Sequence, residues 1–208
     1  CRLYKNTLLA FKQGESATVS ITELFKGHPY ETLDFAYPTV SNFVCDLVTT
    51  LGFSQLYLMG VDMGFVDDDY HHSRSSGYYF ENGKQRYDYA KANDTSLLVE
   101  GNLRPFVKTK FEFKVSKTVL EQTFSGRHVE VYNLNDGAKI AGALPLMKDD
   151  ILIMSDPQVK SDALETLNTK AFTAFDLDEF TEKYQQRYQH DALVEELNAF
   201  IPQIAEDV

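Results

Sequence analysis

The stretch Leu56-Tyr57-Leu58-Met59-Gly60-Val61-Asp62 is an apolar run that ends in an acid. Apolar and polar residues do not alternate along it, which is typical of a strand buried on both faces of a parallel sheet. We therefore predict a buried strand over residues 55–61, with Asp62 at its carboxyl end. Ligands of open α/β sheets bind outside the carboxyl ends of the strands, so Asp62 is a candidate catalytic residue. A turn-forming or helix-capping aspartate is the alternative.

The residues before this strand predict a helix over 41–52. Apolar residues repeat on one helical face: Phe43, Val44, Leu47, Val48 and Leu51. Ser41 belongs to a residue type that caps helix amino termini, and Gly52 to the type that ends helices in the left-handed conformation. Helix, short turn and strand form half of a βαβ unit.

A second helix and strand are expected over 109–126 and 128–133. Thr109 and Glu112 have the spacing of a capping box, although the alternation of Phe111 and Phe113 also fits a strand. The intervening stretch 62–105 is polar and rich in tyrosine, which indicates a long functional or mobile loop in which short elements can be hidden. Together these patterns predict an α/β domain with a partly parallel sheet over residues 1–156.

Composition changes after residue 156, where two amphipathic helices are expected. Apolar residues such as Phe180, Tyr184 and Leu197 lie at helical spacing, with Lys183 and Arg187 on the opposite face. We interpret residues 157–208 as a helical tail that packs on the domain or on a partner.

The overall composition excludes several classes of partner. The chain has 208 residues and a formal net charge of −11, whereas duplex-binding proteins carry a basic face, so no nucleic acid partner is expected. No apolar run reaches the roughly 18 residues of a membrane span, so no membrane insertion is expected. The two cysteines, Cys1 and Cys45, have no zinc-site or disulfide-framework spacing, which we interpret as a sign of a reducing compartment.

Two adjacent histidines, His71 and His72, follow the predicted strand within ten residues. Histidine is the commonest general base near neutral pH, so one of the two is a candidate catalytic base. A pair of surface histidines is the alternative. Between strand and histidines lies the acidic run Asp67–Asp69, which is either solvated or supplies one or two ligands to a divalent cation.

Two further groups are candidates for substrate binding. Arg74 and Tyr79 lie in the tyrosine-rich loop, where cations and rings suit an anionic, sugar-containing ligand. The second group is a polar turn after the strand at 128–133, where small residues let a ligand approach the backbone. Its members are Asn133, Asn135, Asp136, Gly137 and Ala138. A mobile surface loop and an ordinary turn are the alternatives.

Several segments together resemble the motility-associated factor (Maf) glycosyltransferase family, whose core domain is related to archaeal 6-hydroxymethylpterin pyrophosphokinases. Their order and spacing agree with the family over about residues 35–147. The matching segments are Pro38-Thr39-Val40-Ser41, Leu51-Gly52-Phe53, the run 56–62, His71-His72, Val107-Lys108-Thr109 and the stretch 131–142. The last is the most specific, because the family carries an "N..eGa.I.G" pattern there.

The resemblance implies a Rossmann-like domain similar to that of bacterial sialyltransferases. It also implies transfer of a nonulosonic acid from a CMP-activated donor to a serine or threonine of flagellin in the cytoplasm, with no metal or other cofactor required. By position, Asp62 and the histidine pair fall at the sugar-nucleotide edge, and residues 133–137 line the same cleft. The family's glycine-rich loop lies upstream and is not found here, so the resemblance implies the C-terminal part of a longer protein.

Two other readings stay open. An ATP-dependent pterin pyrophosphokinase would need Mg²⁺, which Asp62 and one of Asp67–Asp69 could hold. A non-catalytic binding module would use residues 157–208 to dock a partner of the flagellar system. The sequence leaves open the donor sugar, the acceptor and the oligomeric state.

Overall fold

The computed structural model describes residues 8, 10–14, 16–17, 24, 31–67, 72, 75–86, 94–154, 156–172, 176–188 and 190–206. Contacts divide the chain into two compact units. One is Leu33–Leu164, and the other combines Cys1–Thr32 with Glu165–Val208. The division at residue 156 that the sequence predicts stays a prediction.

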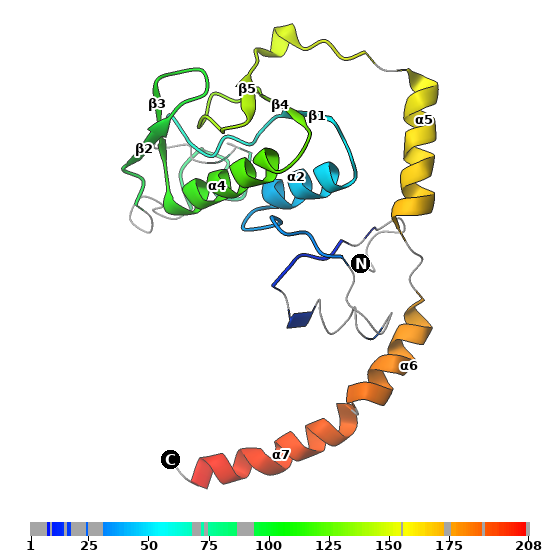
Figure 1. Ribbon diagram of the computed structural model, residues 1–208. Coiled ribbons are helices and arrows are strands. Elements are labelled where there is room, and N and C mark those ends of the chain that lie inside the picture. The colour runs from blue at the N-terminus through cyan, green and yellow to red at the C-terminus, as the bar shows by residue number, and fades with distance from the viewer. Residues whose placement is uncertain are drawn as a thin grey trace. The chain divides into compact units, whose positions relative to one another are not determined.

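The larger unit contains a parallel three-stranded sheet in the order β1-β4-β5 (Figure 1). Its strands are β1 (Gln55–Leu58), β4 (Glu130–Asn133) and β5 (Ala143–Pro145). In the register of the sheet, Leu56 lies beside Val131 and Val131 beside Ala143. Because all three strands are parallel, their carboxyl ends lie at one edge, as predicted. A separate antiparallel pair joins β2 (Leu97–Glu100) to β3 (Phe106–Thr109), and β2 lies inside the predicted long loop.

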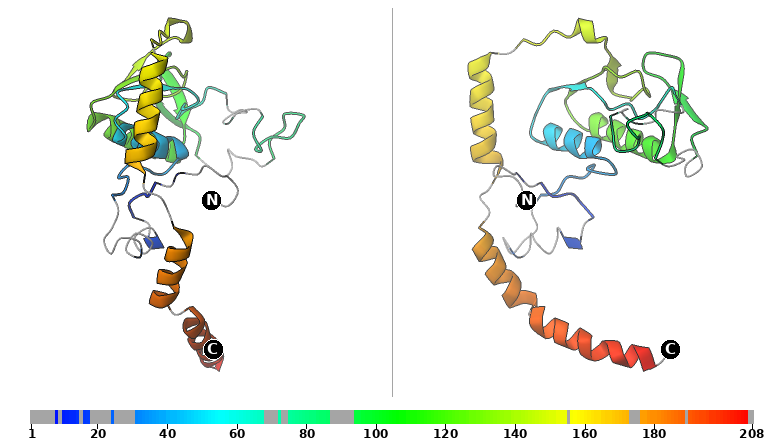
Figure 2. Two further views of the ribbon diagram at one scale, coloured as in Figure 1. Left: turned by 90° about the vertical axis from the view of Figure 1, so that its right-hand side faces the viewer. Right: turned by 180° about the vertical axis from the view of Figure 1, so that it is seen from behind.

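Two helices, α2 (Val40–Thr50) and α4 (Phe111–Ser125), pack side by side on one face of this sheet (Figures 1 and 2). Each helix leads through a short turn into the strand that it covers, α2 into β1 and α4 into β4. Each therefore runs back along its strand, so both helix amino termini lie at the carboxyl edge of the sheet. The α/β class and the helix reading of residues 111–115 are confirmed.

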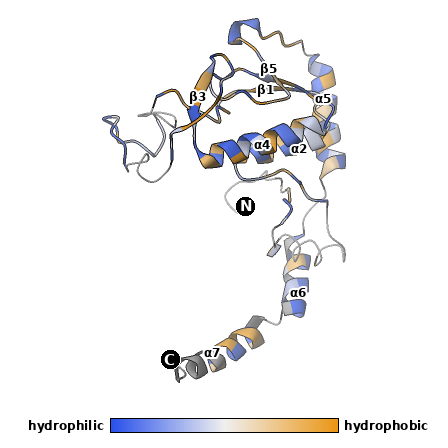
Figure 3. Ribbon diagram, turned by 60° about the vertical axis from the view of Figure 1, so that its left-hand side comes forward, coloured by the Kyte–Doolittle hydropathy of each residue, from blue (hydrophilic) through white to orange (hydrophobic). Residues whose placement is uncertain are grey.

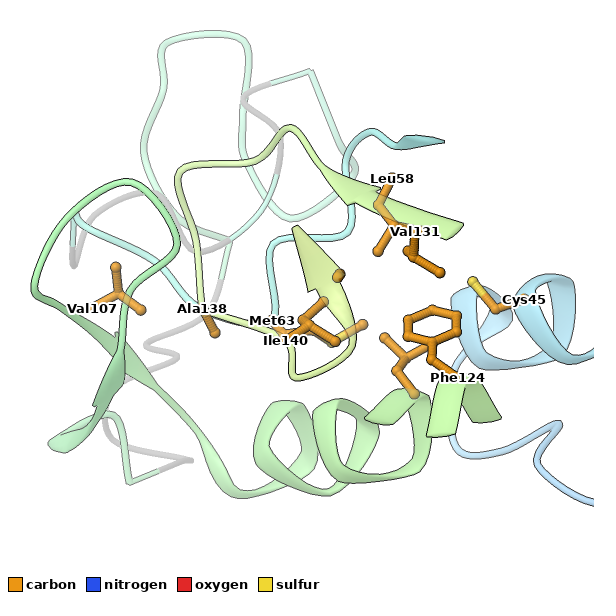
Figure 4. Close-up of a cluster of buried hydrophobic side chains, with 10 residues drawn as sticks. Cys45, Leu58, Met63, Val107, Phe124, Val131, Ala138 and Ile140 are labelled. Carbon is orange, nitrogen blue, oxygen red and sulfur yellow. The ribbon is translucent and has the colours of Figure 1, made fainter. Parts of the chain in front are cut away.

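The hydrophobic core lies between this sheet face and the two helices and extends to Val107 on β3 (Figure 4). It is formed by Cys45, Leu58, Met63, Val107, Leu120, Phe124, Val131, Ala138, Ile140 and Ala143. On the opposite face, Tyr57 stacks on Tyr132 with ring centroids 5.2 Å apart, and Leu144 is 63% exposed. The expectation that β1 is buried on both faces is therefore wrong, because the described helices of this unit cover one face only.

The strand β1 also ends earlier than predicted, at Leu58 instead of residue 61. Gly60 has a φ of +74°, a left-handed conformation that turns the chain away from the sheet. Asp62 consequently lies in a loop four residues beyond the strand, not at its end.

The helix starts also differ from the predictions. The cap of α2 is Thr39 instead of Ser41, and it forms a capping box with Asn42. The predicted capping box at Thr109 is not formed, because Thr109 ends β3 and its hydroxyl donates to Met63 O at 2.8 Å. The helix α4 begins after Lys110, which has no side-chain cap hydrogen bond. Gly52 ends α2 as predicted, with a φ of +86°.

A buried ion pair fixes α2 to the turn that leads into β4. The carboxylate of Asp46 is fully buried and lies 2.9 Å from Arg127 Nη2. It also accepts a hydrogen bond from Phe35 N at 2.7 Å, and Arg127 Nη1 donates to Thr50 Oγ1 at 2.7 Å. These contacts hold α2 against the turn that leads into β4, the strand next to β1.

Helices follow the α/β region as predicted, but the described residues form three α-helices there instead of the two that the sequence predicts. They are α5 (Pro157–Thr166), the π-helical turn η2 (Leu167–Ala171), α6 (Leu177–Tyr188) and α7 (His190–Glu206), and a short 3-10 turn, η1 (Lys148–Asp150), precedes them. Both hydrophobic and hydrophilic residues occur along α6 and α7 (Figure 3). Within the described part of the chain, no helix has the length and apolar character that crossing a bilayer requires.

The substitution Arg127→Met tests the buried ion pair. It leaves the Asp46 carboxylate buried without this countercharge, so we expect the free energy of unfolding to fall by about 3 kcal/mol. The control Lys139→Met removes the exposed partner of Glu100 and should change it by less than about 1 kcal/mol. Urea denaturation of both variants measures the difference, and equal losses would contradict a special role for the buried pair.

Candidate functional site

Two loops meet at the carboxyl edge of the sheet, one after β1 and one after β4. The buried side chain of Asn135 joins them, since its Nδ2 donates to Leu58 O at 3.1 Å and its Oδ1 accepts from Gly60 N at 2.7 Å. Asn133 is fully buried, and its Oδ1 accepts from Asn135 N and Nδ2 at 3.1 and 2.9 Å. In this structure the two asparagines, predicted to line a ligand cleft, hold the loops that would form it.

Gly137 lies against the backbone of Asp62. A Cβ atom at Gly137 would lie 2.1 Å from Asp62 O and 2.7 Å from Asp62 C, so only glycine fits without a shift of the backbone. Next to it, Ala138 is fully buried and its N–H donates to Asp62 O at 2.7 Å. The structure thus brings together Asp62 and the turn at 133–138, which the sequence singled out separately.

Two carboxyl groups at this edge, those of Asp62 and Asp136, have pKa values that are shifted in opposite directions. Asp62 is exposed, but desolvation by the surrounding protein raises its pKa, with a smaller contribution from the charge of Asp136. A hydrogen bond from Arg104 lowers the pKa of Asp136, where Arg104 Nε lies 2.9 Å from Asp136 Oδ1. Two neighbouring carboxyl groups whose pKa values move apart are suited to different protonation roles.

Sequence reasoning missed Arg104 and Asn102, which lie in the loop between β2 and β3. Asn102 is buried and its Nδ2 donates to Asn133 O at 2.9 Å and to Asn135 O at 2.8 Å. These long-range partners leave no local pattern in the sequence. The one usable signal was that both residues stand in a polar segment bounded by Gly101 and Pro105.

His72 lies beside the amino terminus of α4. Its ring stacks on Tyr78 with centroids 3.9 Å apart and meets the edge of Phe113 at 6.3 Å. Its backbone N–H donates to Tyr79 Oη at 3.2 Å. Tyr79 is 3% exposed, so in this structure it supports the His72 segment from within and does not present its ring to solvent. His71, Arg74, Asp68 and Asp69 lie outside the described residues.

The loop after β1 is tied to the segment that carries α4. Thr109 Oγ1 donates to Met63 O, and Phe65 pairs with Lys108 in an antiparallel bridge. Met63 has a φ of +49°, a conformation that is rare for residues other than glycine and that concentrates at functional sites. The Asp62 loop and the aromatic cluster around His72 therefore both lie against the start of α4.

Two other features bear on ligand binding. Among the described residues, no cluster of three or more histidine, cysteine or acidic side chains is arranged to hold a metal ion. A hollow of about 650 Å³ lies at the amino edge of the sheet, lined by Ser54, Gln55 and residues 127–130. It lies at the end of the strands opposite to the loops described above, so it is not part of this candidate site.

The fold and this edge define a Rossmann-like α/β protein. The chain is similar in structure to the Maf glycosyltransferase from Magnetospirillum magneticum AMB-1, with a TM-score of 0.65, 20% sequence identity and coverage of 91% of this chain. The chain spans about a quarter of that protein, since the match covers 26% of its length. No family model and no curated protein sequence matches the chain. At this identity the likeness establishes the fold, and it agrees with the fold that the sequence resemblance implied.

The substitution Gly137→Ala tests the close contact of the two loops. Its Cβ would overlap Asp62 O, so we expect a loss of about 1–3 kcal/mol in the free energy of unfolding. Gly126→Ala is the matched control, because a Cβ there meets Gln122 O at an ordinary 3.7 Å. Thermal unfolding of both variants compares them, and an unchanged melting temperature for Gly137→Ala would contradict the contact.

The substitution Asp62→Asn tests the charge of the edge. Because the folded-state pKa of Asp62 is raised, its ionisation lowers stability as the pH rises through that pKa. Asp62→Asn should therefore raise the melting temperature at pH 7, and the gain should vanish near pH 3, below the unfolded pKa of about 3.9.

Asp136→Asn is the control of opposite sign. The pKa of Asp136 is lowered by Arg104, so its ionised form adds stability that is lost as the pH falls through the lowered value. This variant should have a lower melting temperature than the wild type at pH 7, and the two melting temperatures should become equal in acid. If both variants changed the melting temperature at pH 7 in the same direction, the opposite pKa shifts of Asp62 and Asp136 would be contradicted.

Proposed function

We propose that this chain acts in a glycosyltransferase that moves a nonulosonic, sialic-acid-like sugar from a CMP donor to a protein hydroxyl, with a flagellin-like acceptor in the cytoplasm. The observation that carries the proposal is the joining of Asp62 to the 133–138 turn at the carboxyl edge of a Rossmann-like sheet. Nucleotide ligands of such sheets bind at this edge, beside helix amino termini. The structural likeness to a Maf glycosyltransferase supports the same class of reaction.

In the proposed reaction the acceptor hydroxyl oxygen attacks C2 of the donor sugar. The bond from C2 to the phosphate oxygen breaks, and CMP leaves with its electron pair. A histidine, His72 or its neighbour His71, takes the acceptor proton as general base. The stacking of the His72 ring on Tyr78 and its edge contact with Phe113 restrict the orientation of the ring, which is what a positioned base requires.

The acids and cations at the edge take supporting roles in this proposal. Asp62, whose raised pKa leaves it a weaker acid, faces the reacting hydroxyl or a ribose hydroxyl. The donor's carboxylate and phosphate need cationic or N–H partners, and Arg74 and the turn at 136–138 are the candidates that the sequence supplies. The proposed reaction has no step that requires a metal.

A ligand screen tests the proposal. The intact chain is heated with CMP, CMP-linked nonulosonic acid or ATP, each with and without Mg²⁺. We expect the CMP ligands to raise the melting temperature without metal, since a ligand that binds the native state stabilises it. Stabilisation by ATP with Mg²⁺ alone would favour the pyrophosphokinase reading. An unchanged melting temperature with every ligand would favour a non-catalytic binding module.

Histidine variants test the base. In the active enzyme, replacing the catalytic histidine by alanine should lower the transfer rate about 100-fold or more, as expected for loss of a general base. His71→Ala and His72→Ala are compared with His128→Ala, whose side chain lies at the opposite edge of the sheet. Near wild-type rates in both His71 and His72 variants would contradict the assignment.

A further inference from the structure

The side-chain oxygen of Asn102 is a buried acceptor that the proposed reaction does not yet use. Asn102 lies in the turn between β2 and β3 and is 9% exposed. Solvent does not reach its Oδ1, and this atom accepts no hydrogen bond from any residue that the structure describes. Buried polar atoms are nearly always hydrogen-bonded, because a buried atom without a partner is costly to stability. The Asn102 oxygen therefore calls for a donor.

The orientation of the Asn102 amide is fixed by its other end. Its Nδ2 donates to Asn133 O at 2.9 Å and to Asn135 O at 2.8 Å. A flipped amide would set Oδ1 against these two carbonyl oxygens, which are acceptors as well. The backbone is also held, because Asn102 N donates to Gly137 O at 2.9 Å. The unpaired Oδ1 thus belongs to a firmly held amide and points away from the two carbonyls.

This acceptor lies at the candidate site. The two carbonyl groups that Asn102 binds belong to the turn at 133–138. The same turn meets the backbone of Asp62 through Ala138 N. Asn102 and Asp62 therefore contact one turn at the carboxyl edge of the sheet, which is the edge where nucleotides bind in folds of this kind.

We propose that Asn102 Oδ1 accepts a hydrogen bond from a donor group of the nucleotide bound at this edge, and that Asn102 thereby selects nucleotides that carry this donor. The donor is the amino group of the cytosine base or a hydroxyl of the ribose. A site built to receive such a group rejects analogues that lack it, because its own buried polar atom then stays unpaired. The inference rests on the proposed function for the identity of the nucleotide.

In this proposal the ligand reaches Oδ1 after the two turns separate at their exposed end. The side chains of Arg104 and Asp136 form an ion pair between the turn that carries Asn102 and the turn at 133–138, and they are 38% and 44% exposed. Exposed ion pairs contribute little to stability, so this pair can open at small cost.

The test measures nucleotide binding to the intact chain by calorimetry. CMP is compared with UMP, which has a carbonyl oxygen in place of the amino group, and with 2′-deoxy-CMP and 3′-deoxy-CMP, which each lack one ribose hydroxyl. AMP and IMP are a second pair that differs in an amino group. The variants are Asn102→Ala and Asn102→Ser, which both lack an oxygen at the Oδ1 position. Asn135→Ala is the matched control, because Asn135 is a buried asparagine at the same edge whose Oδ1 already accepts from Gly60 N.

We expect the wild type to bind CMP at least about tenfold more tightly than the analogue that lacks the recognised donor. This preference should disappear in both Asn102 variants, and the analogue concerned identifies the donor as the amino group or one of the hydroxyls. The variants also lose hydrogen bonds to the 133–138 turn, but such a structural loss weakens both members of a pair alike and leaves their ratio unchanged. Asn135→Ala should therefore keep the wild-type preference.

Binding of CMP without any such preference would overturn the inference and leave the proposed donor in place. A preference that survives in the Asn102 variants, as expected if a buried water serves Oδ1, or that is lost equally in Asn135→Ala would also overturn it. No binding of CMP, together with a preference for AMP over IMP that disappears in the Asn102 variants, would refute the proposed donor and keep the role of Asn102. No binding of any nucleotide would refute both.

Discussion

The contact between the backbone of Asp62 and the turn at Gly137–Ala138 is the constraint on which the rest of the site depends. The loop after β1 and the loop after β4 come from distant parts of the sequence, and the hydrogen bond from Ala138 N to Asp62 O joins them at 2.7 Å. The absence of a side chain at Gly137 permits the approach. The side chain of Asn135 joins the same two loops through its hydrogen bonds with Leu58 O and Gly60 N. The contact places the backbone of Asp62 directly against the polar turn.

The second requirement of the site is that the helices α2 and α4 keep a fixed position on the sheet. The pair Asp46–Arg127 and the hydrogen bonds between Asn42 and Ser116 hold α2 and α4 beneath the strands. Both amino termini consequently lie at the edge where the loops meet. This edge combines the acids Asp62 and Asp136 with the amino termini of two helices, whose partial positive charge favours anions.

Much of the fold could be predicted from local patterns. The apolar run at Leu56 located β1, and the helical spacing of Phe43, Leu47 and Leu51 located α2. The face that α2 buries is a different one, however: it is formed by Asn42, Cys45, Asp46 and Thr49. The errors were at boundaries that tertiary contacts decide. Thr109 has the chemistry of a helix cap, yet its hydroxyl donates to Met63 O, so α4 starts later. The apolar run at 56–61 overestimated β1, because Gly60 turns the chain into the loop.

The candidate site was predictable in part for the same reason. Asp62 and the turn at 133–138 were located because each follows a strand, and parallel strands bring such ends together. The inward orientation of Asn133 and Asn135, which brace the loops, follows from contacts that no spacing encodes. Arg104 and Asn102 were missed because their partners are remote in the sequence.

The central claim is that the carboxyl edge is the ligand-binding edge. Hydrogen exchange of the intact chain, measured with and without CMP, tests it most directly. The account predicts slower exchange in residues 59–66, in 134–142 and in the first turn of α4, with no change at the opposite edge. Protection confined to Ser54, Gln55 and residues 127–130, which line the hollow at the amino edge, would contradict it.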